Sequence, residues 1–121
     1  MDLKITPLSD GLGAEATGVD LSKPVDGETK ARLSAAFFEN AVLVIREQDL
    51  SAPQLLEAEQ LFGDVFRQHN TRFSLPECPL IHYLSNQDHY ENGKRYISGA
   101  GYHTDHSNDC TSPKATVHLA K

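Results

Sequence analysis

The sequence has no tryptophan, one methionine and only two cysteines in 121 residues. Cys78 and Cys110 do not form a CxxC pair, so neither a zinc knuckle nor a dithiol redox motif is indicated. Two cysteines are also too few for a disulfide-based scaffold. We expect both to be reduced thiols rather than partners in a bridge.

Long apolar runs and an excess of basic residues are also missing. No stretch approaches the roughly 20 apolar residues that a membrane-spanning helix needs. The opening MDLKITPLSD lacks the apolar core of a secretory signal. Lys and Arg number 11 against 17 Asp and Glu, for a net charge of -6, and this balance argues against binding to nucleic acid phosphates. We therefore expect a cytoplasmic protein that binds neither membranes nor nucleic acid.

The composition that remains is that of a small globular chain. Hydrophobic residues make up 39% and charged residues 23%, which is enough apolar material for a modest core. A length of 121 residues allows one domain at most.

The first half of the chain alternates between strand-like and helix-like patterns. Short strands are predicted at Lys4 to Leu8 and Ala14 to Val19, with glycines marking the turns. The apolar run from Ala41 to Ile45 has the length and composition of a buried central strand.

Two helices are predicted, and each has a recognisable start. Apolar residues recur at helical spacing from Glu28 to Asn40, and Asp26 is a candidate N-cap. A second helix is predicted from Ser51 to about Phe62. Ser51 and Gln54 have the spacing of a capping box, in which each side chain bonds the backbone of the other.

The second half is more irregular. Strands are predicted at Leu80 to Leu84, Tyr102 to Ser107 and Ala115 to Ala120, and a long polar loop separates the first two at residues 85–101. No closing element precedes Lys121, an ending that we interpret as a cut within a domain.

The segment with the clearest chemical content is Tyr102-His103-Thr104-Asp105-His106-Ser107. On a strand, side chains two residues apart share a face, so His103 and Asp105 would converge on one point. They would then be two of the three ligands of a 2-His-1-carboxylate site, which holds non-haem Fe(II). A motif of this kind on its own is more often a hydrogen-bonded surface pair than a metal site, so its context decides.

Four segments together resemble the N-terminal half of the taurine dioxygenase and chlorophenoxyacetate dioxygenase (TauD/TfdA) family. They are ITPLSDGLGAEATGVDLSKP, AVLVIREQDLSAPQLLEAEQLFGDV, YHTDHSN and SPKATVHLAK, in the family's order and spacing. The resemblance implies an α+β chain built on a double-stranded β-helix, a jelly roll of the clavaminate synthase-like kind. Residues 1–121 would be the N-terminal part of one such domain.

The resemblance also implies the function and the site. It indicates an Fe(II)- and 2-oxoglutarate-dependent dioxygenase that uses O2 to hydroxylate a small organic acid, such as a taurine-like sulfonate, a sulfate ester or an aryloxyacetate. His103 and Asp105 match the metal ligands, while Tyr102 and His69 match substrate-pocket positions. The third iron ligand and the arginine that binds 2-oxoglutarate lie in the family beyond the position of Lys121. The isolated chain is therefore expected to be inactive, and the full-length protein to form a homo-oligomer.

Two alternatives remain open on the sequence. The chain is a non-catalytic remnant that interacts with a partner, or it is a small metal-binding module completed by a local histidine. His106 is three residues from His103 and would face the other side of a strand. His118 reads as a hydrogen-bonded sheet histidine rather than a ligand.

Overall fold

The computed structural model describes residues 2–67, 72–85, 87, 89–95, 101–106, 110–111 and 113–121. These residues form two compact units, which are described separately. The first comprises residues 1–64 and 117–121, and the second comprises residues 65–116. The first contains a three-stranded sheet and two helices, and the second a two-stranded sheet. The predicted α+β class is confirmed. The jelly roll stays a prediction, since the described strands form only these two small sheets.

The three-stranded sheet has the order β1-β2-β3, with β1 at Lys4–Pro7, β2 at Ala14–Thr17 and β3 at Leu43–Ile45. β1 runs antiparallel to β2, and β3 runs parallel to it. The prediction of a buried central strand at residues 41–45 was wrong. The run forms β3, which is half-buried and lies at the edge of the sheet, while β2 is central. The strand also starts late, because Ala41 adopts a left-handed conformation (φ 66°) that ends the preceding helix.

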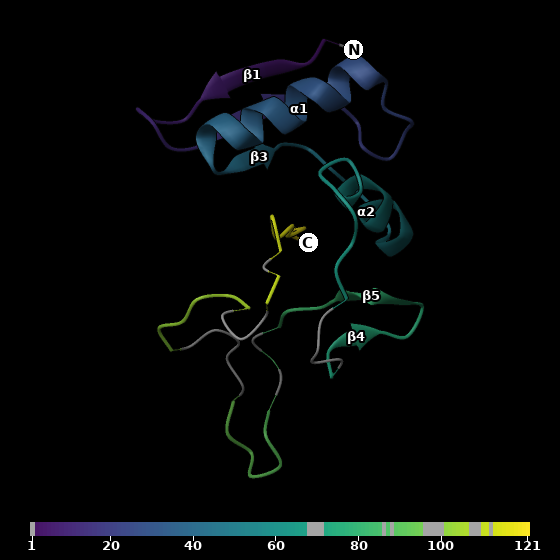
Figure 1. Ribbon diagram of the computed structural model, residues 1–121. Helices are drawn as coiled ribbons and strands as arrows, with labels where there is room; N and C mark the ends of the chain where they lie inside the picture. Colours follow the sequence, from purple (N-terminus) through teal and green to yellow (C-terminus); the bar gives the residue numbers. More distant parts are fainter. Residues whose placement is uncertain are drawn as a thin grey trace. The chain divides into compact units, whose positions relative to one another are not determined.

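Helix α1 (Gly27–Asn40) connects the two parallel strands and packs on both of them (Figure 1). Its start is the predicted one, because the Asp26 carboxylate accepts a hydrogen bond of 2.7 Å from the backbone N–H of Thr29. That bond satisfies one of the free N–H groups of the first turn. At the other end, the N–H of Ala41 donates to the carbonyl of Phe37 at 2.9 Å.

One part of the core of the first unit lies between α1 and β2. The buried side chains of these two elements are Ala14 and Ala16 on the strand and Leu33 and Ala36 on the helix. Residues two apart on a strand share a face, so the two alanines present one surface without bulk. Small residues there allow the helix to approach closely, and Leu33 fills the interface as the one large side chain described as fully buried.

Helix α2 (Ala52–Glu59) follows β3 and begins with the predicted capping box. The N–H of Ser51 donates to the side-chain oxygen of Gln54 at 2.9 Å, and the N–H of Gln54 donates to the Ser51 hydroxyl at 3.4 Å. The helix ends at Glu59 rather than at Phe62. The last turn tightens there, since the N–H of Phe62 bonds to the carbonyl of Glu59 three residues back.

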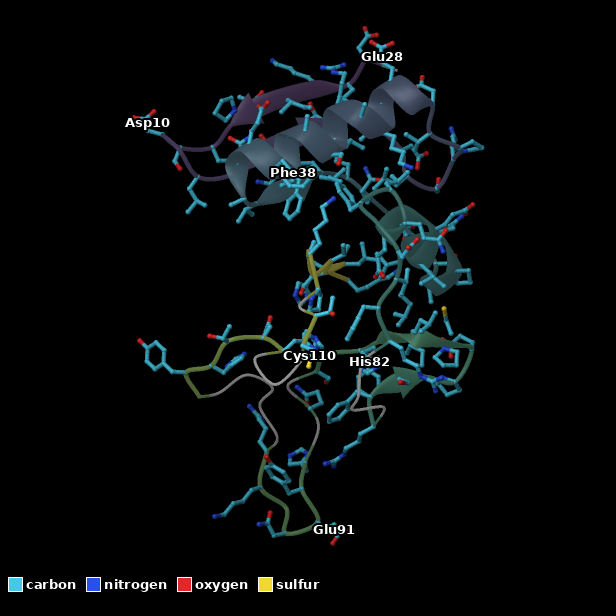
Figure 2. All side chains as sticks on the ribbon, viewed as in Figure 1. Asp10, Glu28, Phe38, His82, Glu91 and Cys110 are labelled. Carbon is cyan, nitrogen blue, oxygen red and sulfur yellow. The ribbon has the colours of Figure 1, made fainter. Side chains whose placement is uncertain are left out.

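The second unit contains the antiparallel pair β4 (Ser74–Leu75) and β5 (Cys78–His82). The predicted strand at 80–84 therefore begins and ends two residues earlier. His82, labelled in Figure 2, lies at the end of β5, and its Nε2 is 3.0 Å from the hydroxyl of Ser74 on β4. Cys78 is buried and Cys110 is exposed, and both are free thiols, as predicted.

Two predicted strands are not strands in the structure. The described residues of the segment 102–107 end in a turn at Asp105 and His106, and residues 115–120 are irregular. A strand needs a neighbour that accepts and donates its backbone hydrogen bonds, and among the described residues neither segment has one. His118 is therefore not the sheet histidine that was predicted. Nor does any described helix have the length and apolar character needed to cross a membrane.

Candidate metal centre

The predicted ligand pair lies in the second unit, in the short segment 101–106. Residues 102–104 have no regular structure, and Asp105 and His106 form a turn. His106 has a φ of 53°, in the left-handed region that only a few per cent of non-glycine residues adopt. The turn therefore lies at the C-terminal end of the segment that carries the predicted ligands.

The His103 imidazole is held at both of its nitrogens. Nδ1 lies 2.7 Å from the carbonyl oxygen of Gly101, and Nε2 lies 3.1 Å from Oδ1 of Asp105. The expectation that His103 and Asp105 converge is thus met, but in an irregular segment and not on a strand. Both side chains are exposed, at 53% and 68%, so solvent and small ions reach them.

These two contacts also favour the protonated form of the ring. The hydrogen bond to the Gly101 carbonyl is the main cause that raises the pKa of His103, and the negative charge of Asp105 adds to it. In the imidazolium form both nitrogens donate, to the carbonyl and to the carboxylate. A metal ion would take the place of the proton on Nε2, because only a neutral imidazole is a ligand.

The geometry of the pair fits a metal ion. Ligand atoms about 2.1 Å from a metal, at adjacent octahedral positions, lie about 3.0 Å apart, and the Nε2–Oδ1 distance of 3.1 Å agrees with this. Metal-binding histidines usually donate their other N–H to a carbonyl or carboxylate, which fixes the tautomer and the ring. The Gly101 carbonyl has that position. The nitrogen and carboxylate donor set also suits Fe(II).

The other predicted site residues are not assembled around this pair. Tyr102 precedes His103 and its side chain is fully exposed. His69 lies outside the residues that the structure describes. Within the described ranges, no group of three or more His, Cys, Asp and Glu side chains is placed to hold a metal.

The neighbouring histidine has a different surrounding. The ring of His106 packs edge-to-face on Phe66, with centroids 5.2 Å apart and an interplanar angle of 83°. Sequence reasoning identified neither this contact nor the role of the Gly101 carbonyl. The first joins residues that are far apart in the chain, and the second is a backbone atom that residue types do not reveal.

Comparison with known proteins gives the context that the motif alone lacks. The sequence profile of the family described as "Taurine catabolism dioxygenase TauD, TfdA family" matches residues 4–119, nearly the whole chain. The chain belongs to this family. No curated protein sequence matches it. The expected oxidoreductase family, with Fe(II) and 2-oxoglutarate as its cofactors, is confirmed at the level of the family.

Solved structures agree with the membership. A putative alpha-ketoglutarate-dependent taurine dioxygenase from Burkholderia xenovorans is 31% identical, with a TM-score of 0.60 over 64% of this chain and 28% of its own. A putative alpha-ketoglutarate dependent 2,4-D dioxygenase from the same organism is 27% identical, with a TM-score of 0.53 over 59% of this chain and 28% of its own.

A third structure is a complex with a metal. AAD-2, in complex with Mn(II) and N-oxalylglycine, is 28% identical, with a TM-score of 0.50 over 53% of this chain and 25% of its own. In each of the three comparisons, this TauD/TfdA-family chain covers only about a quarter of the length of the solved structure.

Proposed function

We propose that this chain supplies two of the three iron ligands, His103 and Asp105, of an Fe(II)- and 2-oxoglutarate-dependent dioxygenase. The observation that carries the proposal is the 3.1 Å approach of Nε2 and Oδ1, with Nδ1 anchored on the Gly101 carbonyl. Family membership supports the identity of the metal. The third ligand and the 2-oxoglutarate-binding arginine would come from residues beyond Lys121, within one jelly-roll domain.

The residues of this chain have distinct roles in that site. The Gly101 carbonyl holds the proton on Nδ1 and so directs the lone pair of Nε2 towards the metal. Asp105 supplies a negative charge that offsets part of the charge of a divalent cation. When bound, Fe(II) with 2-oxoglutarate would supply the oxidation of a substrate C–H bond by O2. Both side chains of the His103–Asp105 pair are exposed, so the two ligand atoms are accessible to a metal.

The substrate that we propose is a small organic acid. The names of two similar structures refer to taurine and to 2,4-D, one a sulfonate and the other an aryloxyacetate. Both substrates are small molecules with one acidic group. Tyr102 and His69 are proposed to line the substrate pocket, and the exposed ring of Tyr102, next to His103, is available for such a contact.

The test is metal binding and turnover by the protein produced from its native gene. Co(II) and Fe(II) affinities are measured for the native protein and for His103→Ala and Asp105→Ala, with His118→Ala as the matched control. Succinate release is followed with Fe(II), 2-oxoglutarate and candidate acids. We expect each ligand variant to lose at least about tenfold in metal affinity and to lose turnover, while the control keeps both. Equal affinity in the ligand variants and the control would show that the pair is only a surface hydrogen bond.

A further inference from the structure

The turn that presents Asp105 is packed against a distant part of the chain. His106, the second residue of the turn, lies edge-to-face on Phe66, with ring centroids 5.2 Å apart. Phe66 follows helix α2 in the sequence and is 39% exposed, so much of its ring is covered. Aromatic rings in this arrangement attract each other beyond the effect of their buried area, because the edge of one meets the negative face of the other.

The backbone at His106 is left-handed, with a φ of 53°. Glycine, asparagine and histidine adopt this conformation more readily than most residues. His106 directly follows Asp105, whose carboxylate lies 3.1 Å from the His103 ring. A contact that holds the His106 ring therefore restrains the stretch of backbone from which the Asp105 carboxylate projects.

We infer that Phe66 and His106 are positioning residues, whose ring contact holds the turn so that Asp105 lies against His103. The effect on the metal rests on the proposed function, whereas the placement of Asp105 does not. His106 acts here through its ring, and it belongs to no cluster of three metal-ligating side chains among the described residues.

Two substitutions separate the ring contact from the backbone conformation. Phe66→Leu keeps apolar bulk and removes the ring, while His106→Asn tolerates a left-handed backbone and removes the other ring. Phe66→Tyr is the conservative variant, because it keeps the aromatic edge and face. Tyr90→Leu is the matched control, since Tyr90 is an exposed aromatic residue of the same unit.

The first measurement needs no metal. In the protein produced from its native gene, nuclear Overhauser contacts between the His103 ring and the Asp105 β-protons report the placement of the carboxylate. We expect these contacts in the native protein, Phe66→Tyr and Tyr90→Leu, and we expect them to weaken in Phe66→Leu and His106→Asn. Unchanged contacts in both of the last two variants would overturn the positioning role.

The second measurement is a double-mutant cycle on Co(II) affinity, with the visible spectrum of bound Co(II) as a report on ligand geometry. An edge-to-face ring pair corresponds to a loss of about 2- to 12-fold. Each single variant is expected to lose that much and to show an altered spectrum, and the double variant to lose no more than either single one. Losses that multiply in the double variant would show that the two rings act separately, and would overturn the inference.

The two proposals fail in different ways. If His103→Ala leaves Co(II) affinity unchanged while Phe66→Leu still removes the Overhauser contacts, the iron site is wrong and the positioning role stands. If His103→Ala abolishes binding while Phe66→Leu changes neither the contacts nor the affinity, the iron site stands and the positioning role is wrong.

Discussion

Truncation of Leu33 to alanine should destabilise the first unit more than truncation of any other side chain on α1. Leu33 is 0% exposed, and the buried residues around the interface are alanines: Ala14 at 1%, Ala16 at 0% and Ala36 at 5% exposed. Alanine has no side-chain torsion with which to fill a space, so the cavity would remain. Leu-to-Ala changes in such sites cost about 2–5 kcal/mol, and we expect about 3 kcal/mol here.

The assay is urea unfolding followed by far-UV circular dichroism. With a denaturant dependence of about 1.5 kcal/mol per molar urea, a loss of about 3 kcal/mol lowers the unfolding midpoint by about 2 M. Small units of this kind have total stabilities of only about 3–10 kcal/mol. At the lower end of that range, Leu33→Ala would be partly unfolded even without urea.

Phe38→Ala is the matched control on the same helix. Phe38, labelled in Figure 2, is 70% exposed, so its truncation removes more atoms but far less buried surface. We expect a change within about 0.5 kcal/mol, because surface substitutions seldom exceed this. A midpoint shift below about 0.5 M for Leu33→Ala, or equal shifts for the two variants, would refute the assignment of the core to the α1–β2 interface.

Three further predictions concern protons and backbone. Metal affinity should rise about tenfold per pH unit below the raised pKa of His103 and level off above it, because Nε2 must lose its proton before it binds a metal. Co(II) titrations at several pH values measure this affinity, and an affinity that does not change with pH would contradict the prediction. Burial raises the pKa of Glu59, so the charged carboxylate destabilises the folded state. The free energy of unfolding therefore increases as the pH falls through the raised pKa and the carboxylate becomes protonated. Glu59→Gln should therefore add about 0.5 kcal/mol to the free energy of unfolding at neutral pH, a value discounted for partial exposure. It should add nothing at a pH below the pKa that Glu59 has in the unfolded state. Urea titrations at neutral and at low pH measure this, and an equal gain at the two pH values would rule it out. Gly18→Ala should lower the free energy of unfolding by about 1–3 kcal/mol more than Gly11→Ala does. Both glycines have a positive φ, but only at Gly18 would a Cβ overlap the Asp2 carbonyl. Equal melting temperatures for the two variants would show that this overlap is relieved without cost.

Helix caps, which act within one turn of the chain, could be predicted from the sequence. The Asp26 cap and the Ser51–Gln54 capping box are examples, and the structure contains both. Each depends on a side chain and a backbone group three residues apart, so the residue types and their spacing suffice. The ends of helices were harder to predict. Helix α2 ends at Glu59 and not at about Phe62, because a tighter last turn replaces the helical hydrogen bonds there.

The His103–Asp105 pair was also identified from the sequence, although for a partly wrong reason. The spacing predicted a strand that places both side chains on one face, whereas in the structure they lie 3.1 Å apart in an irregular segment that ends in a turn. Both geometries bring an imidazole and a carboxylate together, which is why the prediction of their convergence held. The strand failed because a strand depends on a hydrogen-bonded neighbour, which no local pattern specifies.

The sequence by itself determined the family, the helix starts and the identity of the candidate ligands, because each is a matter of residue types at short spacing or in a specific order. Only the tertiary structure decided that β2 is the central strand, that the Gly101 carbonyl contacts the His103 ring and that the ring of Phe66 packs on His106. The first and third join residues that are far apart in the chain, and the second uses a backbone atom. Such contacts depend on how the chain folds back on itself, and the residue types at neighbouring positions do not specify this.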